Sequence, residues 1–166
     1  IFKNYESSSI KDSNFNTFKY IWDPIFMFEK IIIQDINNEN LNNDYNYDNS
    51  FKTIHKENIF IDKESNVMPA VILDASKGPI VIRKNVHIDI GSLLQGPLFI
   101  DDNSYISLGA KIRFNTLIGE NCKVGGEVIN SIFYKKANKA HDGVLGHSFV
   151  GVWVNIGAGT NNSNLK

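Results

Sequence analysis

The sequence predicts a mainly β protein, a parallel β-helix of hexapeptide repeats that is preceded by an α-helical linker. Three observations support this fold. Aliphatic residues recur every six positions through the second half of the chain, a mostly small residue follows each one after four positions, and an upstream segment has the apolar spacing of a helix. We therefore expect a linker region at 1–58 and a β-helix domain at 59–166.

The six-residue repeat is unbroken over eight hexads. The aliphatic series is Ile82, Ile88, Leu94, Ile100, Ile106, Ile112, Ile118 and Val124, and its companions are Val86, Ser92, Leu98, Ser104, Ala110, Thr116, Cys122 and Val128. Earlier hexads start at Ile61, Val67 and Leu73, and the rule is expected to return at Val144, Val150 and Ile156. Three hexads make one triangular coil, whose interior is buried only against the coils on either side.

The upstream helix is expected over 23–37. Asp23 is placed to cap it, and Pro24 suits the first helical position. One apolar stripe follows at three- to four-residue spacing, formed by Ile25, Phe28, Ile32 and Ile36. The segment 37–50 is nearly all Asn, Asp and Tyr, and it has too little aliphatic surface to offset the entropy of ordering it, so we expect a disordered insertion.

Composition excludes several function classes. The 166 residues are 42% hydrophobic and 21% charged, which fits a folded domain, and the net charge of −1 argues against a nucleic-acid partner. A single cysteine, Cys122, rules out an intramolecular disulfide and is expected to be a small buried hydrophobe. We see no membrane-spanning run and no secretory signal, so a cytoplasmic protein is expected. Because the chain starts at Ile1 and stops within a polar run at Lys166, we expect it to be an internal piece of a longer polypeptide.

The segment 130–143 interrupts the repeat. Val124 and Val144 are twenty residues apart, two more than three hexads, so we expect the chain to bulge outward here. Irregular segments on a rigid scaffold are where binding groups collect. This one carries Lys135, Lys136, Lys139, His141 and Asp142.

These segments resemble the hexapeptide-repeat acyltransferases, which have left-handed β-helices and form trimers. The branch that they resemble most is the bifunctional N-acetylglucosamine-1-phosphate uridylyltransferase/glucosamine-1-phosphate N-acetyltransferase, in its variant bacterial form. The matching residues are Lys139-Ala-His141, Leu145-Gly146, Val154-Asn-Ile-Gly-Ala-Gly-Thr160 and Asn164. The resemblance covers about 59–166, and the helix after Trp22 is similar to the connector that joins the nucleotidyltransferase domain to the β-helix.

The resemblance implies roles in catalysis for two residues. His141 resembles the general base that takes a proton from the attacking sugar amine, a task that suits an imidazole near neutral pH. The backbone N–H of Ala158 falls where the family stabilises the tetrahedral oxyanion. Asp142 is a candidate for orienting the imidazole. The tyrosine expected three residues after the histidine is Val144 here, so its contact to the sugar is lost.

The resemblance also implies substrate-binding residues. Asn155 and Asn164 match positions that contact the amino sugar or the acetyl group. Lys139 and Arg113, with Lys135 as a further candidate, are expected to neutralise the sugar phosphate. The implied co-substrate is acetyl-CoA, the implied acceptor is glucosamine 1-phosphate and the implied assembly is a homotrimer. Mg²⁺ is implied only for the nucleotidyltransferase domain, which is outside these 166 residues.

Other functions remain open on the sequence alone. The chain is alternatively an acyltransferase for another sugar or sugar nucleotide, or a non-catalytic trimeric scaffold. A zinc enzyme like the γ-class carbonic anhydrases uses the same fold, but His141 and His147 are six residues apart and are expected to project from successive faces. We interpret His87 and His147 as surface residues, and a solvated loop is the simple alternative for the lysines at 135–139.

Overall fold

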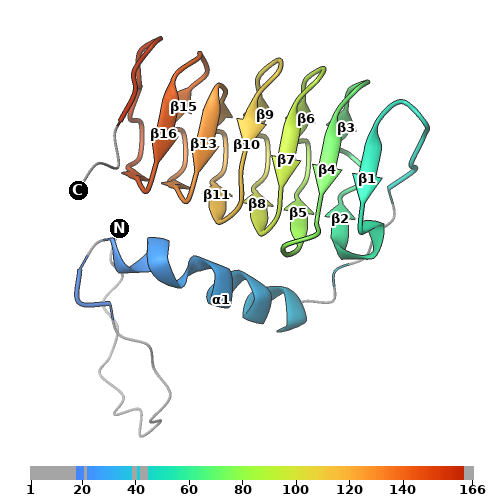
Figure 1. The fold of residues 1–166 in the computed structure, drawn as a ribbon, viewed down its shortest axis with the longest axis horizontal. Helices are drawn as coiled ribbons and strands as arrows, with labels where there is room; N and C mark the ends of the chain where they lie inside the picture. Colours follow the sequence, from blue (N-terminus) through green and yellow to red (C-terminus); the bar gives the residue numbers. More distant parts are fainter. Residues whose placement is uncertain (1–17, 21, 39–40, 42–44, 163–166) are drawn as a thin grey trace, which may run out of the picture.

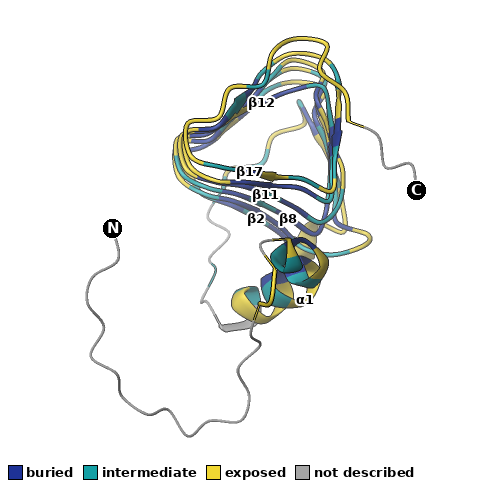
Figure 2. Cartoon of the chain, turned by 90° about the vertical axis from the view of Figure 1, so that its left-hand side faces the viewer, coloured by how far each residue is buried: buried dark blue, intermediate teal, exposed yellow. Residues whose placement is uncertain are grey.

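The structure is a computed structural model, and it describes residues 18–20, 22–38, 41 and 45–162. The chain forms a parallel β-solenoid of about six turns with one helix before it, which confirms the predicted left-handed β-helix and its helical linker. Its cross-section is a triangle with an apolar interior, and the helix lies outside one face (Figures 1 and 2). Each side of the triangle is a parallel sheet whose strands come from successive coils.

We name the three sheets A, B and C, and we give the strands of each sheet in their order along the solenoid. Sheet A contains β1 (Lys52–Ile54), β4 (Ile72–Asp74), β7 (Leu93–Gln95), β10 (Lys111–Ile112), β13 (Glu127–Ile129) and β16 (Val144–Gly146). Sheet B contains β2 (Ile59–Ile61), β5 (Ile80–Ile82), β8 (Leu98–Ile100), β11 (Thr116–Ile118), β14 (Ile132–Phe133) and β17 (Phe149–Val150). Sheet C contains β3 (Asn66–Val67), β6 (His87–Ile88), β9 (Tyr105–Ile106), β12 (Lys123–Val124) and β15 (Asn138–Lys139).

The hexad rule describes the interior up to β12. All eight aliphatic residues from Ile82 to Val124 are buried, and so are all eight of their companions from Val86 to Val128. Cys122 is buried among them, and burial raises the pKa of its thiol and keeps it protonated. This protonated, enclosed sulfur fits the predicted structural role and not that of a nucleophile.

The prediction of an outward bulge at 130–143 is wrong. The segment forms a regular part of the solenoid that includes β14 and β15. The solenoid shortens here: Ile106 pairs with Val124 eighteen residues later, whereas Val124 pairs with Lys139 after only fifteen. Two of the three residues are lost at the corner between sheets C and A, which takes four residues at 107–110 but only Gly125 and Gly126 one coil later. The third is lost between sheets A and B, since Ile112 and Leu117 are five residues apart but their partners Val128 and Ile132 are only four apart.

This shortening also changes the register of the last coils. Leu145, not Val144, pairs with Val128 and is buried, whereas the Val144 side chain is on the outer face and is 40% exposed. Val150 returns to the interior as predicted, opposite Phe133. Simple counting of hexads fails after Val124 because a corner can lose residues while the strands remain paired.

The first coil begins before the expected residue 59, because β1 at Lys52–Ile54 already belongs to sheet A. A short 3₁₀ helix, η1 (Lys56–Asn58), connects β1 to β2. Within the Asn-rich segment 37–50, residues 39–40 and 42–44 are outside the described part of the chain. Tyr45 and Tyr47 are described, and both pack on the core next to buried Phe51.

The linker helix α1 (Asp23–Asn38) covers sheet B (Figure 2). Of the four residues of the predicted stripe, Ile25, Phe28 and Ile32 are buried and Ile36 is partly buried. The carboxylate of Asp23 does not cap the first turn, since it accepts hydrogen bonds from the backbone N–H groups of Lys19 and Tyr20 before the helix.

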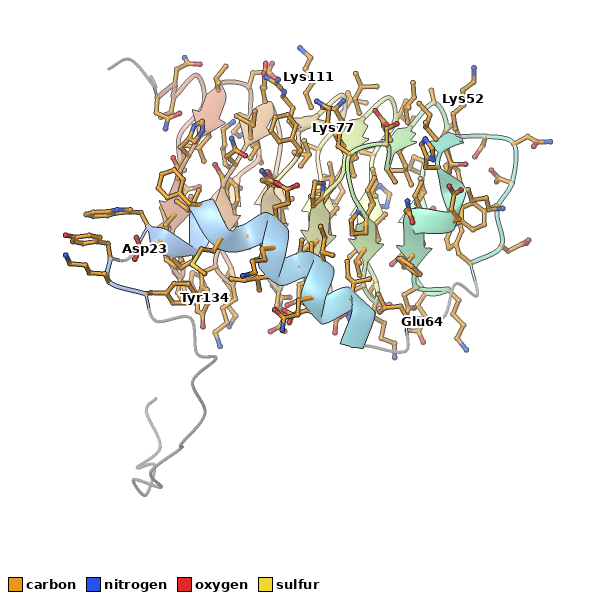
Figure 3. All side chains as sticks on the ribbon, turned by 60° about the horizontal axis from the view of Figure 1, so that its bottom comes forward. Asp23, Lys52, Glu64, Lys77, Lys111 and Tyr134 are labelled. Atoms are coloured by element: carbon orange, nitrogen blue, oxygen red, sulfur yellow. The ribbon has the colours of Figure 1, made fainter. Side chains whose placement is uncertain are left out.

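The helix and sheet B line an apolar cavity of about 350 Å³ that is open to solvent on one side. It is lined from the sheet by Val81, Phe99, Leu117, Ile132, Tyr134 and Phe149. Tyr134 lies beside the first turn of α1, while Lys52, Lys77 and Lys111 lie on the far side of the solenoid (Figure 3). Among the described residues, no helix has the length and apolar character needed to cross a bilayer.

Candidate active site

The catalytic residues predicted from the sequence meet at one corner of the solenoid. We call the turns that lead from sheet C to sheet A the CA corner. His141 and Asp142 belong to this corner after β15, and Ala158 and Gly159 belong to it one coil later. The backbone N–H of Gly159 donates to the carbonyl oxygen of Asp142 at 2.9 Å, so the two turns are in direct contact. His141 and Asp142 are both exposed to solvent.

Glycine 143 allows the two turns to approach closely. Its φ is +129°, and a Cβ there would collide with the carbonyl oxygen of Thr160. Asn161 and Asn162 fasten the later turn to β16, since their side-chain oxygens accept from the N–H groups of Val144 and Gly146 at 2.7 and 2.8 Å. The last described turn is therefore held by a set of hydrogen bonds directly beside the turn that carries His141.

The Ala158 N–H is suited to the role that the resemblance implies. Ala158 is exposed, and within the described part of the chain its N–H donates to no acceptor. Its neighbours Gly157 and Gly159 add no side chains, so the backbone at this point is open to solvent. An unpaired N–H beside a histidine-bearing turn is the kind of donor that an oxyanion requires.

Lys139 requires a correction. The sequence suggested that it binds the sugar phosphate, but its side chain points into the solenoid and is only 1% exposed. Its Nζ donates to the carbonyl oxygens of Gly125, His141 and Gly143 at 2.9, 3.0 and 2.9 Å. An ammonium has three N–H donors, and all three are engaged here, so none is left for a phosphate.

Arg113 and Asn155 lie on two different faces. Arg113 is on the outer face of sheet A, where its guanidinium contacts the carboxylate of Glu127 at 3.1 Å. Asn155 is exposed on sheet C, and its side-chain oxygen accepts from the amide of Asn138 at 2.8 Å. Sheets A and C meet at the CA corner, and side chains on the outer faces of a convex corner diverge. One chain therefore does not bring Arg113 and Asn155 to a common ligand.

The other candidate residues are spread over the molecule. Asn164 is outside the described residues. Lys135 and Lys136 are exposed in the turn between sheets B and C, and the Lys136 ammonium lies 5.4 Å from the centre of the Trp153 ring. His147 is in the turn between sheets A and B, with a ring nitrogen 3.0 Å from the amide nitrogen of Asn130. His87 is on sheet C, and its ring stacks on Tyr105.

The positions of the histidines bear on the zinc alternative. His141 and His147 are at different corners, as the six-residue spacing indicated. Within the ranges that the structure describes, no three His, Cys, Asp or Glu side chains come together in a group suited to a metal ion.

Sequence reasoning missed two parts of this site. The Asn161 and Asn162 hydrogen bonds have no signal in the hexad pattern. Gly125 and Gly126 did have one, because adjacent glycines at a position where the repeat expects a turn indicate a tighter corner.

In comparisons with known proteins, the chain matches no family model and no curated protein. The case for a function therefore depends on the geometry of the CA corner and on the fold that carries it.

Proposed function

We propose that the chain is the acyl-transferring β-helix of an acetyl-CoA-dependent N-acetyltransferase acting on glucosamine 1-phosphate, within a larger sugar-nucleotide enzyme. The observation that carries the proposal is the contact between the His141 turn and the Ala158 turn at the CA corner. It puts a candidate base and a candidate oxyanion donor on consecutive coils. A β-helix fold compatible with hexapeptide-repeat acyltransferases supports the same reaction.

In the proposed reaction, the neutral amine of the sugar attacks the thioester carbon, and the His141 imidazole accepts the proton that the amine nitrogen loses as the C–N bond forms. The Ala158 N–H donates to the carbonyl oxygen as negative charge develops there. Collapse of the tetrahedral species breaks the C–S bond, and the expelled CoA thiolate takes the proton from the His141 imidazolium, which leaves the acetamide and regenerates the neutral base. An exposed imidazole suits the first step because it stays accessible to the acceptor.

The separation of Arg113 from Asn155 supports a site shared between copies of the chain. Because these residues are on diverging faces, a ligand that contacts both must lie between two solenoids. A closed homotrimer provides such clefts, and each cleft would take the CA corner from one copy and sheet A from its neighbour.

The test is release of CoA thiol by the full parent chain, with and without glucosamine 1-phosphate. His141→Ala is expected to lower the sugar-dependent rate by two or more orders of magnitude, in the range typical of a lost general base. His147→Ala is the matched control, since His147 is also an exposed corner histidine but lies at a different corner. Equal rates in wild type and His141→Ala would remove His141 from the mechanism. Absence of release by a folded wild-type chain would contradict the assigned acceptor.

A further inference from the structure

The structure contains a buried cation directly beneath the candidate active site. Lys139 is the partner of Val124 in sheet C, and it continues an interior column otherwise formed by Val67, Ile88 and Ile106. A lysine in this column replaces an aliphatic side chain in the solenoid interior. A buried charge is costly unless it is fully hydrogen-bonded, so its presence needs an explanation.

The surroundings of the ammonium are built from backbone carbonyls. Gly125 contributes one oxygen from the previous coil, and His141 and Gly143 contribute two from the turn after β15. Among the described residues, no carboxylate forms an ion pair with Lys139. Burial lowers the pKa of Lys139, and the nearby Asp142 charge opposes that shift. The three carbonyl dipoles serve in place of a counter-ion.

The short corner at Gly125–Gly126 makes this arrangement possible. A Cβ on Gly126 would lie 2.8 Å from the Lys139 Nζ, 2.7 Å from the Gly143 oxygen and 2.9 Å from the His141 oxygen. The ammonium and two of its acceptor oxygens thus lie in the space that a side chain at position 126 would occupy. Gly126 also has a φ of +69°, which glycine adopts without strain.

We propose that Lys139 is a positioning residue: its buried ammonium ties the turn that carries His141 to the preceding coil. The ammonium holds the backbone carbonyl of His141 itself and that of Gly143 on the other side of Asp142, so the turn is fixed at both ends. The tether is a property of the fold. Its effect on catalysis rests on the proposed role of His141.

Lys139→Met tests the tether, because methionine keeps the length and apolar stem of lysine and removes the charge. Lys63→Met, at an exposed lysine in the turn between β2 and β3 of the first coil, is the matched control. In the full chain, hydrogen exchange of the Glu127 and Gly159 amides, which donate to the carbonyl oxygens of Gly143 and Asp142 in the tethered turn, is expected to quicken at least about tenfold in Lys139→Met, with a peptide covering β9 unchanged. Unchanged exchange of these two amides in folded Lys139→Met would overturn the proposal.

A second measurement uses the wild-type chain and does not depend on any variant folding. Three hydrogen bonds and burial predict a slowly exchanging Lys139 ammonium signal in nitrogen-15 NMR, with couplings to the carbonyl carbons of Gly125, His141 and Gly143. Absence of such a signal would overturn the proposal. Observation of the couplings supports it directly.

Kinetics separate positioning from phosphate binding. Lys139→Met is expected to lower kcat about tenfold or more while the KM for the sugar phosphate changes less than about threefold, and Lys63→Met is expected to change neither. A KM that rises with kcat unchanged would return Lys139 to substrate binding and overturn the proposal. If wild type shows no acetyl transfer but the exchange and NMR results hold, the proposed function fails and the tether stands.

Discussion

Val124 and Lys139 are paired residues in adjacent strands of sheet C, so an aliphatic side chain and an ammonium-bearing one occupy successive levels of the same interior column. The exchange coincides with the shortened corner at Gly125–Gly126. The number of residues per coil therefore falls at the same place where the interior column changes from aliphatic side chains to a lysine. That place adjoins the turn that carries His141 and Asp142.

The stability of the chain is expected to rise with pH relative to Lys139→Met. Burial lowers the pKa of Lys139 below its ordinary 10.5, so between the lowered pKa and 10.5 the unfolded chain binds more protons than the folded one. Stability rises with pH over such a window. Urea unfolding of both proteins at several pH values up to about 10 measures the difference. A difference in stability that stays constant with pH would contradict the lowered pKa of Lys139.

Gly143→Ala is expected to destabilise the chain more than Gly109→Ala. Both glycines have positive φ and both belong to the CA corner, but a Cβ at Gly143 meets the Thr160 carbonyl and one at Gly109 meets nothing within 4 Å. The Gly109 change should cost about 1–2 kcal/mol through backbone strain alone. Thermal unfolding of the two variants compares them, and equal costs would show that the contact with Thr160 is easily relieved.

Phe28→Ala is expected to release α1 from sheet B. The Phe28 side chain is buried against the sheet, and truncation of a buried phenylalanine typically costs about 3–5 kcal/mol. Phe26→Ala is the control, since Phe26 is on the same helix but is 74% exposed. Limited proteolysis should cut within 23–38 faster in Phe28→Ala only. Similar cutting of both variants would mean that the buried stripe does not hold the helix.

Serine is expected to replace Cys122 at little cost. The Cys122 sulfur lies 3.0 Å from the carbonyl oxygen of Tyr134, and Ser104, one coil earlier, already donates from the equivalent position to the Gly119 oxygen at 2.8 Å. We expect Cys122→Ser to change the free energy of unfolding by less than about 1.5 kcal/mol. Cys122→Leu should cost more, by about 1–3 kcal/mol, through overpacking. Denaturant unfolding of both variants ranks them, and the reverse order would contradict the hydrogen-bonding argument.

The sequence predicted the interior where corner lengths are constant. From Ile82 to Val124 the aliphatic residues and their companions are buried where the repeat predicts, because each six-residue side of the triangle needs an aliphatic residue and a mostly small one at fixed interior positions. The prediction failed at Lys139 and Val144, because Gly125 and Gly126 remove two residues from the preceding corner. Counting then placed Lys139 in a surface loop and Val144 in the interior. In the structure, Lys139 is buried and Val144 is exposed.

The candidate site was predictable in part. Motif residues indicated His141 and Ala158, and the structure places their turns in contact. That Arg113 and Asn155 lie on diverging faces was not predictable, because the register change at Gly125–Gly126 lies between them in the chain and decides which sheet Asn155 reaches. The hydrogen bonds of Lys139 depend on carbonyl groups, which have no signature in side-chain patterns.

The position of α1 alters how the solenoid is expected to unfold. In a stack whose coils contact only their neighbours, an end coil can detach alone at a small cost. Here one helix lines a common cavity with strands from β5 to β17, and it runs along the stack beneath them (Figure 1). The coil that contains β17 therefore contributes Phe149, which is 39% exposed, to a cavity that it shares with α1. Peeling that coil away also exposes part of the helix stripe, so local fraying is coupled to undocking of the linker and unfolding becomes more cooperative.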